Sequence, residues 1–153
     1  MTYRIVAGID GSPHSEAALR WSLDLAEARQ GELTAVFSWQ VPFMSVPMAF
    51  DRGQLEQEYK QYLVDVVDVV SAVAPSPLVP VQTLVAEGDP AEALIIASQR
   101  ADLLVLGTRG RSPFAGMVLG SVSQRCAAAA LCPVVLVKAV EPAGPPAAEP
   151  GRP

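Results

Sequence analysis

Residues Leu103–Ser121, LLVLGTRGRSPFAGMVLGS, contain an apolar run, a glycine-rich loop and the start of a helix. The run Leu103–Leu106 carries no polar residue, as expected of a strand that is covered on both faces of a sheet. Glycine follows this run at once, and the pair Gly120-Ser121 precedes a segment rich in alanine. This order predicts a buried strand whose carboxyl end opens into a loop that leads to a helix.

Similar apolar runs recur along the chain and alternate with segments of helical periodicity. The predicted strands are Arg4–Ile9, Leu33–Trp39, Val81–Ala86, Leu103–Leu106 and Pro133–Val137. The predicted helices run from Ser12-Pro13 to Gly31, from Gln54 to Ala74, from Asp89 to near Arg100, and onward from Ser121. Apolar strands joined by helices predict an α/β fold, with a parallel sheet that has helices on both faces.

Capping residues and apolar spacing define the predicted helices. Ser12 and Pro13 favour a helix start, because serine caps the free amides and proline fits the first turn. Asp89 predicts another capped start, and Ser121 with Gln124 has the spacing of a capping box. The apolar residues that recur at helical spacing are Ala18, Trp21, Leu25 and Ala28 in the first helix, and Leu55, Tyr59, Tyr62, Val66, Val69 and Val73 in the second.

The composition fits a single globular domain and excludes some partners. The 153 residues carry a net charge of −5, and 50% of them are hydrophobic. Duplex nucleic acid is held by a dense basic face, which an acidic chain with few lysines does not offer. No apolar run is long enough to span a membrane, and the N-terminal residues do not resemble a signal peptide. We therefore expect neither nucleic acid nor membrane as a partner.

The cysteines and the histidine argue against a metal centre. Cys126 and Cys132 have no zinc-type spacing, and His14 is the sole histidine. We expect both cysteines to be small buried residues of a reduced, cytoplasmic protein. The proline-rich residues 139–153 predict a disordered tail. The apolar loop Pro42–Phe50 suits a flap over a ligand, a contact with a partner subunit, or packing on the domain.

Ligands of an open parallel sheet bind at the carboxyl ends of the strands, where the strand order reverses. Glycines there let the backbone approach a ligand, and a helix N-terminus offers free amides and a positive dipole end. The loop from Gly107 to Ser121 therefore suits an anion without any lysine. The alternative is that Gly107 and Gly110 only turn the chain and Ser121 only caps the helix. Neither a Walker A motif nor a GxGxxG turn is found.

Four short motifs together resemble the nucleotide-binding branch of the universal stress protein family. They are GID at residues 8–10, GDPAEAL at residues 88–94, the pattern G-x2-G-x9-G-S from Gly107 to Ser121, and CPV at residues 132–134. The resemblance covers about residues 3–138 and assigns residues 1–138 to one domain. It implies a Rossmann-like, doubly wound five-stranded sheet of order 3-2-1-4-5 that binds ATP or a related adenine nucleotide.

The resemblance also implies which residues hold the nucleotide. The phosphates would lie against Gly107, Gly110, Gly120 and Ser121, with Thr108, Arg109, Arg111 and Val122 as neighbours. The ribose hydroxyls would contact Asp10, beside the backbone of Gly8 and Ile9, and the adenine would lie near Ser38. A strand-end carboxylate suits the ribose independently, because it accepts hydrogen bonds from a diol and repels phosphate. The alternative role of Asp10 is that of a turn residue at the helix entry.

Three functions remain open on these residues. The first is an ATP-binding stress-response regulator that acts through a homodimer or an unidentified protein partner, and the resemblance places the dimer contact at Val134–Val137. The second is a weak ATPase, although the sequence offers no nucleophile–base constellation. Glu87 and Asp89 are candidates to place Mg²⁺, but Asp89 is better suited to capping a helix and Glu87 to a solvated loop. The third is a dimeric interaction module with a purely structural glycine loop.

Overall fold

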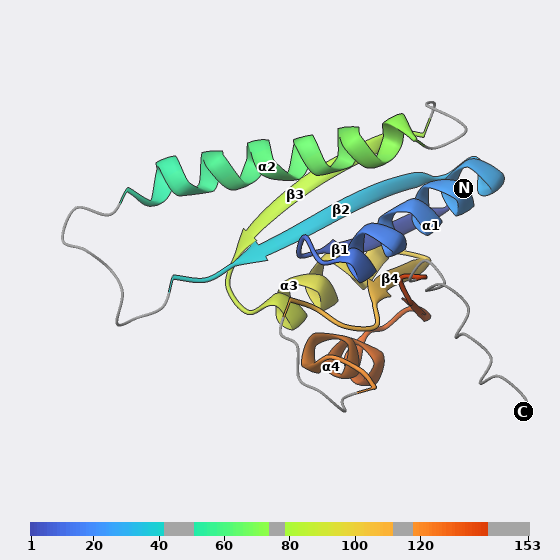
Figure 1. Cartoon of the computed structure of the whole chain (residues 1–153). Coiled ribbons are helices and arrows are strands. Elements are labelled where there is room, and N and C mark those ends of the chain that lie inside the picture. The colour runs from blue at the N-terminus through green and yellow to red at the C-terminus, as the bar shows by residue number, and fades with distance from the viewer. Residues whose placement is uncertain (42–50, 74–78, 112–117, 141–153) are drawn as a thin grey trace, which may run out of the picture.

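The computed structural model describes residues 1–41, 51–73, 79–111 and 118–140. Five parallel strands form one sheet in the order β3-β2-β1-β4-β5 (Figure 1). The strands are β1 (Arg4–Ile9), β2 (Glu32–Trp39), β3 (Val81–Glu87), β4 (Leu103–Gly107) and β5 (Val134–Val137). The fold class and the strand order predicted from the sequence are confirmed.

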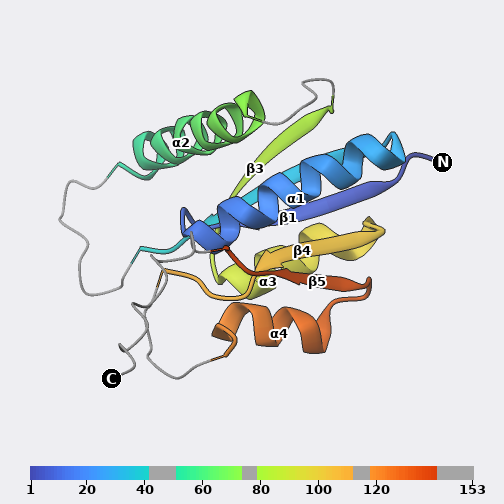
Figure 2. The same ribbon diagram turned by 45° about the vertical axis from the view of Figure 1, so that its right-hand side comes forward.

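Helices cover both faces of the sheet, as predicted. On one face lie α1 (Pro13–Arg29) and α2 (Arg52–Ala72), and on the other lie α3 (Pro90–Ala97) and α4 (Ser121–Ala129) (Figure 2). A short 3₁₀ turn, Ser98–Arg100, follows α3. Successive strand side chains point to opposite faces, so β1 supplies Ile5 to the core under α1 and α2 and Val6 to the core under α3 and α4.

The ends of α1 follow local rules. The Ser12 hydroxyl accepts a hydrogen bond from the Ser15 amide at 3.2 Å, so Ser12 is the predicted N-cap. The helix ends at Arg29, because Gln30 rather than the expected Gly31 takes the left-handed conformation, with φ of 51°. Gly31 serves another purpose, since a side chain at this position would collide with the backbone carbonyl of Tyr3.

The buried face of α1 differs from the expected stripe. Ala18 is fully buried and Leu25 half-buried, but Trp21 is 38% exposed and Ala28 is exposed. Besides its apolar residues, the helix buries two serines against the sheet, and apolar spacing alone does not detect them. The buried residues of α1 are Ser15, Ala18, Leu19, Ser22, Leu23 and Ala26. The Ser22 hydroxyl is satisfied within the helix, where it donates to the Ala18 carbonyl at 2.7 Å.

The buried face of α2 is also displaced from the prediction. Val69 and Val73 are 70% and 66% exposed, whereas Leu63, Val67 and Val70 are buried. The rest of the predicted stripe, Leu55, Tyr59, Tyr62 and Val66, is half-buried beside the core. Apolar residues form two adjacent stripes along this helix, and only the position of the sheet decides which one is buried. The helix begins at Arg52 because the Asp51 carboxylate caps it, accepting from Gly53 N at 2.9 Å.

Two predictions lie wholly or mostly outside the described residues. The apolar loop falls at residues 42–50, and most of the predicted tail falls at residues 141–153. Within the described residues, no helix combines the length and the apolar character that crossing a membrane requires.

The displaced face of α2 leads to a matched pair of substitutions. We expect Leu63→Ala to lower the free energy of unfolding by about 2–5 kcal/mol, because it opens a cavity in the core. Val69→Ala should change it by less than about 0.5 kcal/mol, because Val69 is mostly in water. Denaturant unfolding measures both values. A larger loss for Val69→Ala than for Leu63→Ala would show that α2 packs through the sequence-predicted stripe.

Candidate functional site

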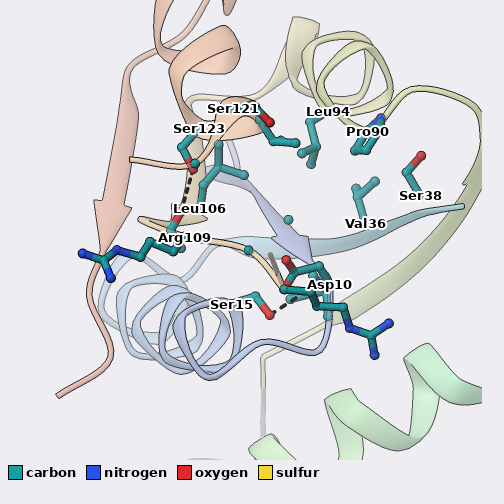
Figure 3. A pocket seen from close by; sticks show the side chains of 17 residues that line it. Asp10, Ser15, Val36, Ser38, Pro90, Leu94, Leu106, Arg109, Ser121 and Ser123 are labelled. Carbon is teal, nitrogen blue, oxygen red and sulfur yellow. Dashed lines mark hydrogen bonds between the residues drawn. The ribbon is translucent and has the colours of Figure 1, made fainter. Parts of the chain in front are cut away.

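A cavity of about 340 Å³ lies at the carboxyl ends of the strands, beside the boundary between β1 and β4 (Figure 3). The strand order reverses at this boundary, because the chain leaves β1 toward β2 and later returns to β4. This is where an open parallel sheet binds its ligands. The volume of the cavity lies at the lower end of the range for small-molecule pockets.

Most residues that the sequence marked as a binding site line this cavity. They are Gly8, Ile9, Asp10, Ser38, Gly107, Arg109, Gly110, Arg111, Gly120, Ser121 and Val122. Thr108 is the exception, because it is buried at 6% exposure with its hydroxyl 3.3 Å from His14 Nδ1. The structure thus brings together segments that lie as much as a hundred residues apart in the sequence.

Sequence reasoning missed several lining residues. They are Ser15, Val36, Pro90, Leu94, Leu106 and Ser123. Strand alternation was a sufficient signal for Val36, which shares a face with Ser38 two residues later. Pro90 and Leu94 lie one helical turn apart in α3, and both belong to the GDPAEAL motif at residues 88–94. The contribution of Ser15 had no such signal, because it depends on where the first turn of α1 packs.

Asp10 is held at the end of β1 by the turn that follows it. Its Oδ1 accepts a hydrogen bond from the Ser12 amide at 2.9 Å, and Gly11 takes a φ of 78°. Its Oδ2 faces Gly110 so closely that a Cβ there would lie 2.7 Å from this oxygen. Asp10 therefore acts as a turn residue through Oδ1, as the alternative prediction held. Its other carboxylate oxygen, Oδ2, is directed at the glycine loop.

The two ends of the glycine loop are joined at its base. The Gly120 amide donates to the Thr108 carbonyl at 2.8 Å, and the Thr108 amide donates to the Val137 carbonyl at 2.9 Å. The Ser123 hydroxyl donates to the Gly107 carbonyl at 2.7 Å. The loop therefore begins and ends beside the cavity.

The predicted cap of α4 is wrong. Gly120 is the N-cap, no side-chain hydrogen bond caps the helix in the described residues, and Ser121 is the first helical residue. Gln124 does not complete a capping box, since its Nε2 donates to the Leu119 carbonyl at 3.2 Å. A Cβ at Gly120 would meet its nearest neighbours only at ordinary contact distances of 3.5 Å or more, so crowding does not require glycine at this cap. The first amides of α4 therefore lie at the cavity without a side-chain acceptor.

Neither arginine of the loop directs its guanidinium plainly into the cavity. The Arg109 guanidinium points away from it (Figure 3). The Arg111 guanidinium lies beside Gly11, since a Cβ at Gly11 would be 3.1 Å from its Nη2. Both side chains are exposed. In the described part of the loop, the polar groups that face the cavity are thus chiefly those of the backbone.

The other end of the cavity is apolar. Val36, Leu94 and Leu106 are buried there, with exposed fractions of 5% or less. Ser38 adds a hydroxyl, which donates to the Gly88 carbonyl at 2.8 Å. A cavity that is apolar at one end and rich in backbone amides at the other suits a ligand with a flat apolar part and an anionic part.

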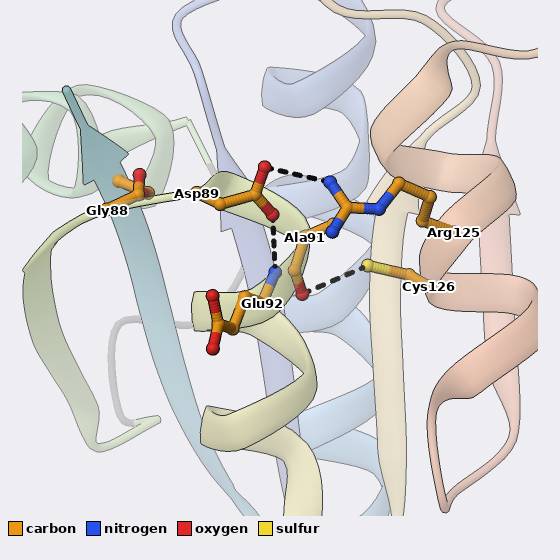
Figure 4. A network of polar contacts seen from close by, with 7 residues as sticks. Gly88, Asp89, Ala91, Glu92, Arg125 and Cys126 are labelled. Carbon is orange, nitrogen blue, oxygen red and sulfur yellow. Dashed lines mark hydrogen bonds and ion pairs between the residues drawn. The ribbon is translucent and has the colours of Figure 1, made fainter.

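An ion pair links the two helices that form one wall of the cavity (Figure 4). Asp89 Oδ1 accepts from the Glu92 amide at 2.9 Å and caps α3, as predicted, while Oδ2 pairs with Arg125 Nη1 of α4 at 2.8 Å. The hydrogen bond from Arg125 is the main reason that the pKa of Asp89 lies below its usual value. Glu87 is exposed to solvent as expected, but it is the last residue of β3 rather than a loop residue, and it pairs with Arg52 at 3.0 Å.

The described residues contain no cluster of three or more metal-binding side chains. Cys126 is fully buried, and this burial raises the pKa of its thiol to about 11. It therefore stays a neutral, unreactive thiol near pH 7, as expected of a buried cysteine. Cys132 is half-buried, and both thiols are free.

The comparison with known proteins identifies the family. The model of the Universal stress protein family matches residues 1–138. This chain belongs to the universal stress protein family. A universal stress protein of Mycobacterium tuberculosis is 36% identical over 135 residues, which are 88% of this chain and 45% of the relative. The chain thus spans about half the length of the first curated relatives that it matches.

Two solved structures of the family show the same fold. A universal stress protein in complex with cAMP has a TM-score of 0.68 and 24% identity, covering 91% of this chain and 98% of the other. A family protein of Arabidopsis thaliana with AMP bound has a TM-score of 0.58 and 17% identity, covering 89% of this chain and 91% of the other.

The two roles of Asp89 separate in a pair of variants. Asp89→Ala should destabilise the protein by about 1 kcal/mol because the cap of α3 is lost, whereas Asn still caps and should cost less. The pKa of Asp89 is lowered in the folded state, so the contribution of its charge is present above the unfolded pKa. It is lost as pH falls through the folded pKa. Thermal unfolding between pH 7 and pH 2 measures this. Equal losses for Asn and Ala would contradict the cap.

Proposed function

We propose that this universal stress protein binds ATP or a related adenine nucleotide in the cavity beside β1 and β4 and acts as a stress-response regulator. The observation that carries the proposal is the cavity itself, with backbone amides at one end and apolar side chains at the other. The solved relatives with cAMP and AMP support an adenine nucleotide as the ligand class.

The phosphates belong at the glycine end in this proposal. Gly107, Gly110 and Gly120 allow close approach, and Ser121 and Val122 open α4 with amides that have no intrahelical acceptor. The positive end of the α4 dipole favours an anion at this position. Thr108, Arg109 and Arg111 flank the loop. A movement of one exposed arginine toward the phosphates adds charge to a site built from amides.

The nucleoside belongs at the other end. Asp10 Oδ2 is directed at the interior of the site and is proposed to accept a ribose hydroxyl, beside the backbone of Gly8 and Ile9. Val36 and Leu94 offer apolar contact to a base, near the end of β2 at Ser38.

The carboxylates near the cavity do not form a Mg²⁺ site of their own. Glu87 and Asp89 are engaged with Arg52 and Arg125, and among the described lining residues only Asp10 carries a carboxylate. A Mg²⁺ ion that arrives with ATP would be held mainly by phosphates and water. We therefore propose nucleotide binding as the function and assign no residue to hydrolysis.

We further propose a homodimer that forms through β5, and a regulatory partner that recognises it. β5 is an edge strand, and all of its residues, Val134–Val137, are half-exposed. An apolar edge strand with free backbone groups is suited to pair with a second copy. Both free thiols agree with a reducing, cytoplasmic setting.

Gly120→Val tests the phosphate end of the site. A Cβ at Gly120 would meet its nearest neighbours at 3.5 Å or more, so the domain should stay folded while the larger side chain obstructs the amides. We expect ATP affinity by calorimetry to fall at least about tenfold, with the melting temperature within a few degrees of the wild type. Unchanged affinity in the folded variant would overturn the placement of the phosphates.

Asp10→Asn tests the ribose end. Asn retains an oxygen that accepts from Ser12 N, so the turn is kept while the carboxylate is lost. Wild-type protein should prefer ATP to 2′-deoxy-ATP, and the variant should lose most of this preference, which calorimetry with the two nucleotides measures. An equal loss of affinity for both sugars would show that Asp10 does not contact the 2′-hydroxyl.

A further inference from the structure

His14 connects three segments that meet beside the cavity. It is the second residue of α1, and its Nδ1 lies 2.8 Å from the amide nitrogen of Ala139, just beyond β5. Thr108 Oγ1, in the first turn of the glycine loop, lies 3.3 Å from the same ring nitrogen. Figure 2 shows the chain leaving β5 beside the first turn of α1.

The chemistry of the contact fixes the role of the imidazole. A backbone amide can only donate, so Nδ1 is the acceptor and the proton of the neutral ring is on Nε2. Nδ1 has one lone pair, and the Ala139 amide is the nearer of its two neighbours. The Thr108 hydroxyl, 3.3 Å away, makes the longer contact with the same lone pair, so this one acceptor joins both segments. The hold on Ala139 therefore depends on the position of Thr108.

Thr108 is itself tied to the base of the loop. Its carbonyl accepts from the Gly120 amide, and its own amide donates to Val137. The backbone after Thr108 is tied to the start of α1 as well, because the hydroxyl of the N-cap residue Ser12 donates to the Arg109 carbonyl at 3.4 Å. A displacement of the base of the loop is thus passed to Thr108 and His14 through direct contacts.

We propose that His14 is a positioning residue that fastens the chain leaving β5 to the first turn of the glycine loop, so that filling the cavity is transmitted to Lys138–Val140. The transmission by nucleotide rests on the proposed function, whereas the fastening does not. A ligand that binds more tightly when these contacts are formed strengthens them, and by linkage the loss of the contacts weakens ligand binding. Binding of a ligand in the cavity then changes the stability of the segment that follows β5 at the edge of the sheet.

Two substitutions of His14 separate its acceptor from its bulk. Asn places an oxygen close to the position of Nδ1, while Leu fills similar space with no acceptor. Hydrogen exchange of the Ala139 amide by NMR is the structural readout, and ATP calorimetry is the functional one. We expect His14→Leu to speed Ala139 exchange about fivefold and to weaken ATP about two- to fivefold, with His14→Asn within about twofold of the wild type in both. ATP should slow Ala139 exchange in the wild type.

The outcomes distinguish the two claims. Unchanged Ala139 exchange in His14→Leu, or equal defects in Leu and Asn, would overturn the fastening. If the wild type binds no adenine nucleotide, the proposed function fails. The role of His14 is then tested without ligand, by comparing the single variant Gly110→Ala with the double variant Gly110→Ala/His14→Leu. A Cβ at Gly110 would lie 2.7 Å from Asp10 Oδ2, so either this carboxylate or the loop must move. This shift should alter Ala139 exchange when His14 is present, and an equal effect without His14 would contradict the coupling.

Discussion

The close approach of β4 to the first turn of α1 is the constraint on which the rest of the site depends. A Cβ at Gly107 would lie 2.7 Å from the His14 carbonyl carbon and 2.9 Å from the Ser15 amide nitrogen. Both neighbours are helical backbone that cannot move aside, so only glycine ends the strand here. The loop then leaves the sheet directly over α1, where Gly110 meets Asp10.

This packing explains why the site is built from backbone groups. Gly107 packs on α1, and the Gly120 amide donates a hydrogen bond back to the Thr108 carbonyl. This bond places the start of α4 at the cavity. The Ser123 hydroxyl and the Asp89–Arg125 pair hold α4 to β4 and α3. The exposed ion pair itself adds little stability, so its use is to align helices.

The fold follows from local patterns, because strands buried on both faces and the caps at Ser12 and Asp89 depend only on neighbouring residues. Most of the cavity lining also follows, since the motif glycines gather at one edge of the sheet. The buried face of α2 does not follow, because Val69 and Val70 are identical in type and adjacent in sequence. Only the packing of the helix on the sheet determines which of the two is buried. The cap at Gly120 and the link from His14 to Ala139 depend on segments that meet only in the folded chain.

The central claim is that amides of the glycine loop and of the α4 N-terminus hold the phosphates of a nucleotide. Titration of ATP into ¹⁵N-labelled protein, followed by amide chemical shifts, tests it most directly. The account predicts saturable shifts that are largest at Gly107, Gly110, Gly120 and Val122, with adenosine alone shifting the end near Ser38 and Leu94. Shifts centred elsewhere on the surface, or none at millimolar ATP, would contradict it.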